Sequence, residues 1–67
     1  MLEMQYVVKH GDEPQKEISA PNIVEAENQV KRALIEKGAS ILNVTFIGDT
    51  GSIIESTNGT FQIKQVL

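Results

Sequence analysis

Residues 22–37 read NIVEAENQVKRALIEK, and this stretch without glycine or proline is the most informative part of the sequence for the fold. Its apolar side chains recur at the helical spacings of three and four, which align Ile23, Ala26, Val30, Ala33 and Leu34. Asn22 can cap the first turn with Glu25 three residues later, and Gly38 can end the helix in a left-handed conformation. Glu27 and Lys31 are expected to pair on the solvent side. The stretch predicts one helix from about Asn22 to Lys37.

The chain before this helix predicts a hairpin of two strands. Polar and apolar side chains alternate from about residue 3 to residue 10, which is the period of a strand with one buried face. Residues 11–14 read GDEP and have the composition of a turn. Residues 16–20 then form a short second strand that closes the hairpin.

The chain after the helix predicts three more strands. Residues 41–47 alternate again and are followed by a turn over residues 48–51. Residues 52–57 and 60–66 flank Asn58-Gly59, the pair favoured in a type I′ turn, where both central residues have positive φ. Such a turn would place Ile54 opposite Ile63.

The order strand-strand-helix-strand-strand-strand predicts an α+β fold, with the single helix packed on one face of a mainly antiparallel sheet. Residues 1–67 are long enough for a single small domain. The alternation of the strands predicts the core residues on the helix-covered face: Met4, Tyr6, Val8, Leu42, Val44, Phe46, Ile54, Phe61 and Ile63.

The opposite face of the sheet cannot be covered by the same helix. The alternation places four aliphatic side chains there, namely Val7, Ile47, Ile53 and Val66. A contiguous apolar patch is typical of a binding or self-association surface, whereas scattered surface aliphatics are common and need no explanation. These four residues are the candidate partner-binding site.

Composition excludes several classes of function. The absence of cysteine removes disulfide scaffolds, thiolate zinc sites and thiol nucleophiles, and it fits a reducing compartment. Six lysines and arginines against nine acidic residues give a net charge of -3, which disfavours nucleic acid as a partner. No export signal or membrane-length apolar run is apparent, so we expect a cytoplasmic protein without a membrane partner. Because the core is small, we also expect a homodimer.

One motif points to catalysis. Asp49-Thr50-Gly51-Ser52 resembles the Asp-Thr-Gly-Ser/Ala active-site signature of the aspartic protease family. The resemblance implies that Asp49 would share a proton with a second such carboxylate and activate water. It covers four residues, and Gly48 stands where the family has an apolar residue. A β-turn is the other interpretation of the motif.

Two further patterns are weaker. His10, Asp12 and Glu13 could attract a cation, but the chain has one histidine and a zinc site needs three or four ligands, so we expect no metal and no cofactor. The aromatic residues are expected in the core, which leaves no platform for stacking bases. Residues 20–26, APNIVEA, look like a layout shared by a ribosomal protein family and many small phage proteins.

Together these patterns favour a protein that is not an enzyme. One helix and one sheet are expected to leave little room for a pocket, so we predict a protein-protein interaction module that acts through an exposed sheet face or strand edge. Its size and acidity are similar to those of phage-type inhibitors of host proteins, including anti-CRISPR proteins. The alternative is an RNA- or ribosome-associated protein, and an aspartic-protease-like fragment is a remote alternative.

Overall fold

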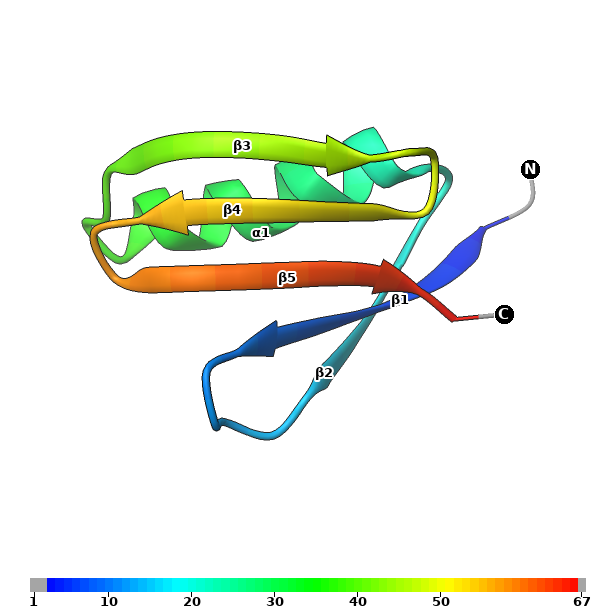
Figure 1. Cartoon of the computed structure of the whole chain (residues 1–67), viewed down its shortest axis with the longest axis horizontal. Helices are drawn as coiled ribbons and strands as arrows, with labels where there is room; N and C mark the ends of the chain where they lie inside the picture. Colours follow the sequence, from blue (N-terminus) through cyan, green and yellow to red (C-terminus); the bar gives the residue numbers. More distant parts are fainter. Residues whose placement is uncertain (1–2, 67) are drawn as a thin grey trace.

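The computed structural model describes residues 3–66 and confirms the α+β fold. One helix packs on a five-stranded antiparallel sheet (Figure 1). The elements in chain order are β1 (Met4–His10), β2 (Lys16–Ala20), α1 (Ile23–Glu36), β3 (Ile41–Ile47), β4 (Gly51–Ser56) and β5 (Gly59–Gln65). The strand order in the sheet is β2-β1-β5-β4-β3, so β2 and β3 are the two edges.

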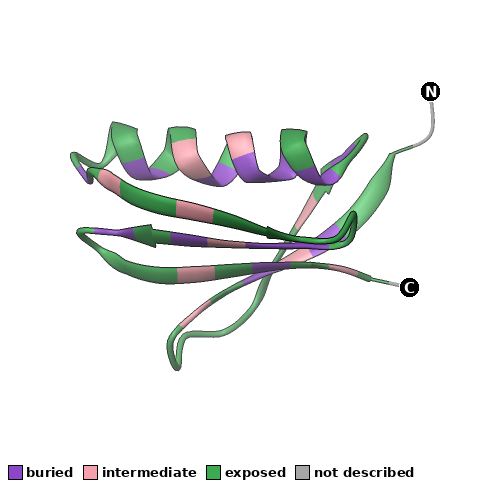
Figure 2. Cartoon of the chain, turned by 45° about the horizontal axis from the view of Figure 1, so that its top comes forward, coloured by how far each residue is buried: buried purple, intermediate pink, exposed green. Residues whose placement is uncertain are grey.

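The helix begins and ends where its sequence predicts. Asn22 has an extended backbone, and its Oδ1 accepts a 2.9 Å hydrogen bond from the N–H of Glu25. After the C-cap residue Lys37, Gly38 has a φ of 86° and turns the chain toward β3. The sheet-facing side of α1 is buried (Figure 2). Glu27 corrects one expectation, because it pairs with Lys31 at 3.2 Å yet is only 3% exposed instead of lying on the solvent side.

The core lies between α1 and the facing side of the sheet. Its strand residues include Tyr6 and Ile54, which are at most 1% exposed, and Ile63 on β5 between them. Three predicted core residues are wrong, because Met4, Leu42 and Phe46 are exposed. Each lies near the margin of the sheet, beyond the region that one helix can cover.

Leu42 is exposed for a specific reason. The pairing of β3 with β4 shifts register between Ile41 and Asn43, which is the mark of a bulge. Ile41 packs against the core, and Leu42 is left 66% exposed. A prediction that assumes strict alternation through residues 41–47 cannot account for this extra residue.

The last hairpin turns one residue earlier than predicted. Ser56 pairs with Gly59, so Thr57 and Asn58 form the connection. Among the described residues only glycines have positive φ, and Gly59 has a φ of 112°. The predicted type I′ turn with Asn58 at positive φ is therefore wrong.

The shift changes partners but not faces. Ile54 lies opposite Phe61 instead of Ile63, a displacement of two residues. Because successive side chains alternate between faces, a displacement of two leaves every residue on its predicted side. The prediction of which hairpin residues face the core is therefore correct, although the predicted turn is wrong.

Neighbouring side chains hold the turn in its observed place. The Ser56 hydroxyl donates to the carbonyl of Gly59 at 2.9 Å and accepts from the N–H of Asn58 at 3.1 Å. Thr57 exchanges two hydrogen bonds with Ser40, the second residue after Gly38. These contacts link the turn to the residues that follow α1. The preference of an Asn-Gly pair for a type I′ turn takes no account of them.

Candidate functional site

The four candidate residues Val7, Ile47, Ile53 and Val66 lie on the sheet face opposite α1, which we call the outer face. Val7 and Ile53 have intermediate burial, whereas Ile47 and Val66 are more exposed, at 55% and 48%. Across the sheet, Lys64 pairs with both Val7 and Gly51, and Gly51 pairs with Ile47. Lys64 and Gly51 thus divide the set into two pairs. One is Val7 with Val66, and the other is Ile47 with Ile53.

The two edges of the sheet differ in chemistry. The β2 edge is five residues long, includes Lys16 and Glu17, and is flanked by the only two prolines of the chain, Pro14 and Pro21. Charges, prolines and short length are the features by which proteins prevent pairing at an exposed edge. β2 is thus a protected edge.

The β3 edge lacks charges and prolines and is longer, and its bulge is confined to the first residues, between Ile41 and Asn43. Its seven residues, ILNVTFI, include no charged residue and no proline. Because β3 has β4 as its single strand neighbour within residues 3–66, alternate residues present N–H and C=O groups outward. β3 is therefore open to pairing with another strand.

Exposed apolar side chains lie on both sides of β3. Leu42, Phe46 and Ile47 on the strand itself are 66%, 46% and 55% exposed. On α1, Val24 and Ile35 are also exposed. At 100° per residue they lie opposite Ala33, which lines the β1–β2 side, so they are on the flank of α1 nearer to β3. We call these five residues together with the β3 backbone the β3 edge surface.

A cleft opens on the other side of the helix. α1 follows β3 and β4, while the β1–β2 hairpin crosses at an angle and diverges from it (Figure 1). The resulting cleft has a volume of about 340 Å³, contrary to our expectation that this fold leaves little room for a pocket. Its apolar walls are Val8, Ile18, Val30, Leu34 and Phe61.

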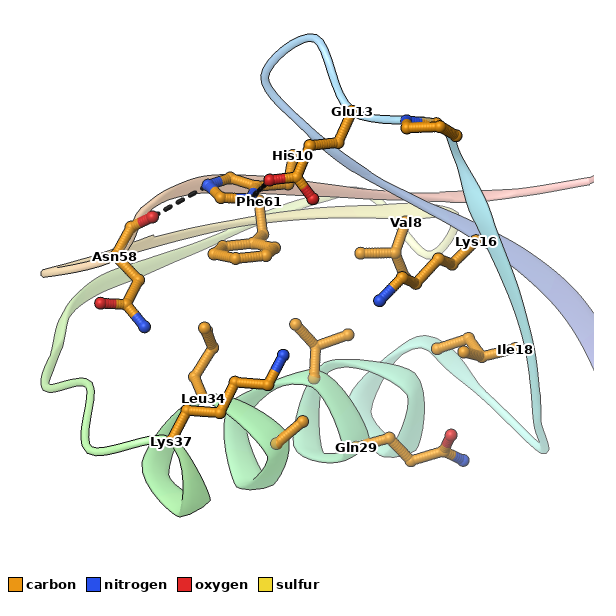
Figure 3. Close-up of a pocket in the computed structure, with 13 residues that line it drawn as sticks. Val8, His10, Glu13, Lys16, Ile18, Gln29, Leu34, Lys37, Asn58 and Phe61 are labelled. Carbon is orange, nitrogen blue, oxygen red and sulfur yellow. Dashed lines mark hydrogen bonds and ion pairs between the residues drawn. The ribbon is translucent and has the colours of Figure 1, made fainter.

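Charged groups enter the cleft from two elements. The side chains of Lys16 on β2 and Lys37 at the end of α1 extend toward the space between the helix and the sheet (Figure 3). Within residues 3–66, neither ammonium group lies within 4.0 Å of a carboxylate. The cleft therefore combines apolar walls with two unpaired positive charges.

His10 closes one end of the cleft. Its ring stacks on Phe61 with centroids 4.0 Å apart, and its Nε2 donates to the carbonyl of Asn58 at 2.9 Å. Its Nδ1 lies 3.1 Å from Oε2 of Glu13. With both ring nitrogens engaged, the imidazole serves as a wall and as a link between the β1–β2 hairpin and the last turn.

The structure brings together only part of the two catalytic or metal patterns. His10 meets Glu13, whereas Asp12 is exposed, and the described part of the chain holds no cluster of three or more metal-binding side chains. Asp49 is exposed in the turn between β3 and β4. Ser52 is 1% exposed, its hydroxyl has no hydrogen-bond partner among residues 3–66, and it lies two strands away from His10. The geometry therefore does not pair the Ser52 hydroxyl with His10 as a base.

A comparison with known protein families, curated proteins and solved structures found no match to this chain. No helix in residues 3–66 has the length and apolarity needed to cross a bilayer. The interpretation of function therefore depends on the surfaces described above.

Proposed function

We propose that this chain is a non-enzymatic protein-protein interaction module that pairs through β3 with a second copy of itself. The observation that carries the proposal is the contrast between the protected β2 edge and the uncharged, seven-residue β3 edge. Antiparallel pairing of two β3 strands would extend the sheet across both copies and satisfy the outward backbone groups.

Charge and symmetry support a second copy as the partner. In a two-fold antiparallel pair each residue of β3 faces another residue of β3, and an uncharged strand brings no like charges together. The two-fold axis of this pair places both helices on the same face of the extended sheet, where they run in opposite directions. The Val24 end of one helix then lies toward the Ile35 end of the other, and both ends are apolar and exposed.

Several finer expectations stay predictions. A role as a phage-type inhibitor or regulator of a host protein rests on size and acidity, and a cytoplasmic location rests on composition. RNA or ribosome association stays the alternative. The outer-face residues Val7, Ile53 and Val66 stay candidates for partner binding, and Ile47 belongs to both surfaces.

The test compares one charge added at the edge with one added on the outer face. Leu42→Lys introduces a cation within β3, and Val66→Lys introduces the same cation on the outer face at a residue that is also exposed. Sedimentation over a range of concentrations should show a wild-type dimer whose Kd rises about tenfold or more in Leu42→Lys and stays unchanged in Val66→Lys. Amide exchange should slow at alternate residues of β3 as concentration increases.

The opposite results would each overturn the proposal. A wild type that stays monomeric at millimolar concentration would remove the second copy as the partner. A dimer weakened by Val66→Lys and not by Leu42→Lys would place the interface on the outer face.

A further inference from the structure

The cleft between α1 and the β1–β2 hairpin has a cause in the fold. Pro21 and Asn22 hold the start of α1 close to the end of β2, and Gln29 Nε2 donates to the carbonyl of Ser19 at 2.9 Å. Beyond this contact the hairpin and the helix diverge (Figure 1). The cleft therefore opens from a tethered end toward the C-terminus of α1.

The walls of the cleft are built from the core. Val8, Val30 and Leu34 are buried members of the core cluster, and Ile18 and Phe61 pack against it. The stack of His10 on Phe61 and the bond of His10 to Asn58 fix the far wall. An apolar ligand would therefore meet side chains that are already held in place.

The charges in the cleft select the ligand. The chain carries a net charge of -3, yet two of its cationic side chains, Lys16 and Lys37, extend from opposite walls into this one space (Figure 3). Glu13, the carboxylate among the lining residues, lies against His10 instead of either lysine. A group between the two ammonium ions would be favoured if it carried a negative charge.

We propose that the cleft binds a small amphipathic carboxylate, a free acid whose alkyl or aryl body lies against Val30, Leu34 and Phe61 while its carboxylate lies between Lys16 and Lys37. The volume of about 340 Å³ is at the lower end of the range for small-molecule sites, which suits a ligand of this size. The site is independent of the β3 edge surface, since the two lie on opposite flanks of α1.

Octanoate is a suitable probe because octan-1-ol and octylammonium keep its chain and change only its head group. Titration to about 5 mM, followed by amide chemical shifts, should give saturable changes for octanoate at Ile18, Ala33 and Phe61. Octan-1-ol should bind about tenfold more weakly, and octylammonium should bind more weakly still.

Variants locate the charge effect. Lys16→Gln and Lys37→Gln should each weaken octanoate binding roughly threefold, and the double variant about tenfold. Lys9→Gln and Lys64→Gln are matched controls, because both lysines lie on the outer face, and they should leave binding unchanged. Ala33→Phe places a ring at an exposed position of the cleft wall, so it should abolish binding while thermal unfolding shows that the chain remains folded.

Three outcomes would overturn the assignment. The first is octan-1-ol binding as tightly as octanoate, which would leave the lysines without a role. The second is saturable shifts away from the cleft, or none at all. The third is unchanged binding in folded Ala33→Phe.

Discussion

The β1–β2 hairpin and the β3–β4–β5 meander meet the same helix in opposite ways. The meander lies along α1 and contributes the buried Ile54 and Ile63, but its outer strand β3 is left with a bare apolar edge. The hairpin has a charged, proline-flanked outer edge and diverges from the helix, so it leaves a cleft. One helix of 14 residues cannot cover five strands. On the meander side the uncovered part is an exposed strand edge, and on the hairpin side it is a cleft.

Replacing Gly59 should have the largest effect, because this residue joins the two halves. It has a φ of 112°, and a Cβ there would lie 2.7 Å from Nε2 of His10, whose ring is held by its stack on Phe61. Gly59→Ala should therefore lower the free energy of unfolding by about 2–4 kcal/mol in urea titrations. Gly48→Ala is the matched control, with a φ of 58° and open space around its Cβ, and should cost about 1 kcal/mol.

A double-mutant cycle separates strain from collision. In a His10→Ala background, Gly59→Ala should lose the part of its cost that arises from the collision with His10 and keep the part that arises from its φ of 112°. An unchanged cost of Gly59→Ala in the His10→Ala background would mean that His10 does not press on Gly59, so this contact would not link the β1–β2 hairpin to the meander.

The next prediction concerns the flank of the helix on the meander side. The Glu27 side chain is 4% exposed and its observed ion-pair partner is Lys31, 3.2 Å away. Lys31→Met would leave a buried carboxylate without that partner, so we expect a loss of about 1–2 kcal/mol in stability. Arg32→Met removes a cation from an exposed position and should stay within about 0.5 kcal/mol of the wild type. Equal effects of the two substitutions would contradict a specific Glu27–Lys31 contribution.

Two buried serines of β4 allow a test inside the meander. Ser52 and Ser56 lie on the same face, but Ser56 makes two hydrogen bonds in the turn while the hydroxyl of Ser52 has no partner. Ser52→Ala should raise the melting temperature, with a gain of about 1 kcal/mol, whereas Ser56→Ala should lose about 1 kcal/mol. A destabilised Ser52→Ala would show that its hydroxyl has a partner in solution, such as a buried water.

The smallest effect is expected at the tethered end of the cleft. Gln29→Ala removes the bond to the carbonyl of Ser19, which is exposed, so it should cost about 0.5 kcal/mol in thermal unfolding. Asn28→Ala is the control from the adjacent position. Amide exchange in β2 should accelerate in Gln29→Ala alone, and identical exchange in the two variants would mean that Gln29 does not hold the hairpin to the helix.

Local patterns in the sequence were sufficient to predict the helix, the strands and the face on which most strand residues lie. The spacing of apolar residues, the Asn22 cap and Gly38 located the helix to within one residue at each end. Alternation located β1 and β3, because a period of two depends only on neighbouring side chains, and turn residues located β2, β4 and β5. It also placed Val7, Ile47, Ile53 and Val66 on the outer face, although it could not show that Lys64 and Gly51 separate them.

Other features depend on contacts between residues far apart in the chain, and local patterns did not predict them. The last turn is displaced because Ser40, which follows the helix, exchanges hydrogen bonds with Thr57. Leu42 and Phe46 are exposed because β3 carries a bulge and lies at an edge, and edge position follows from strand order. The cleft exists because the hairpin diverges from α1, which brings Lys16 and Lys37 to one space from positions 21 residues apart. No local pattern encodes that divergence, since it arises from how one helix packs across a twisted sheet.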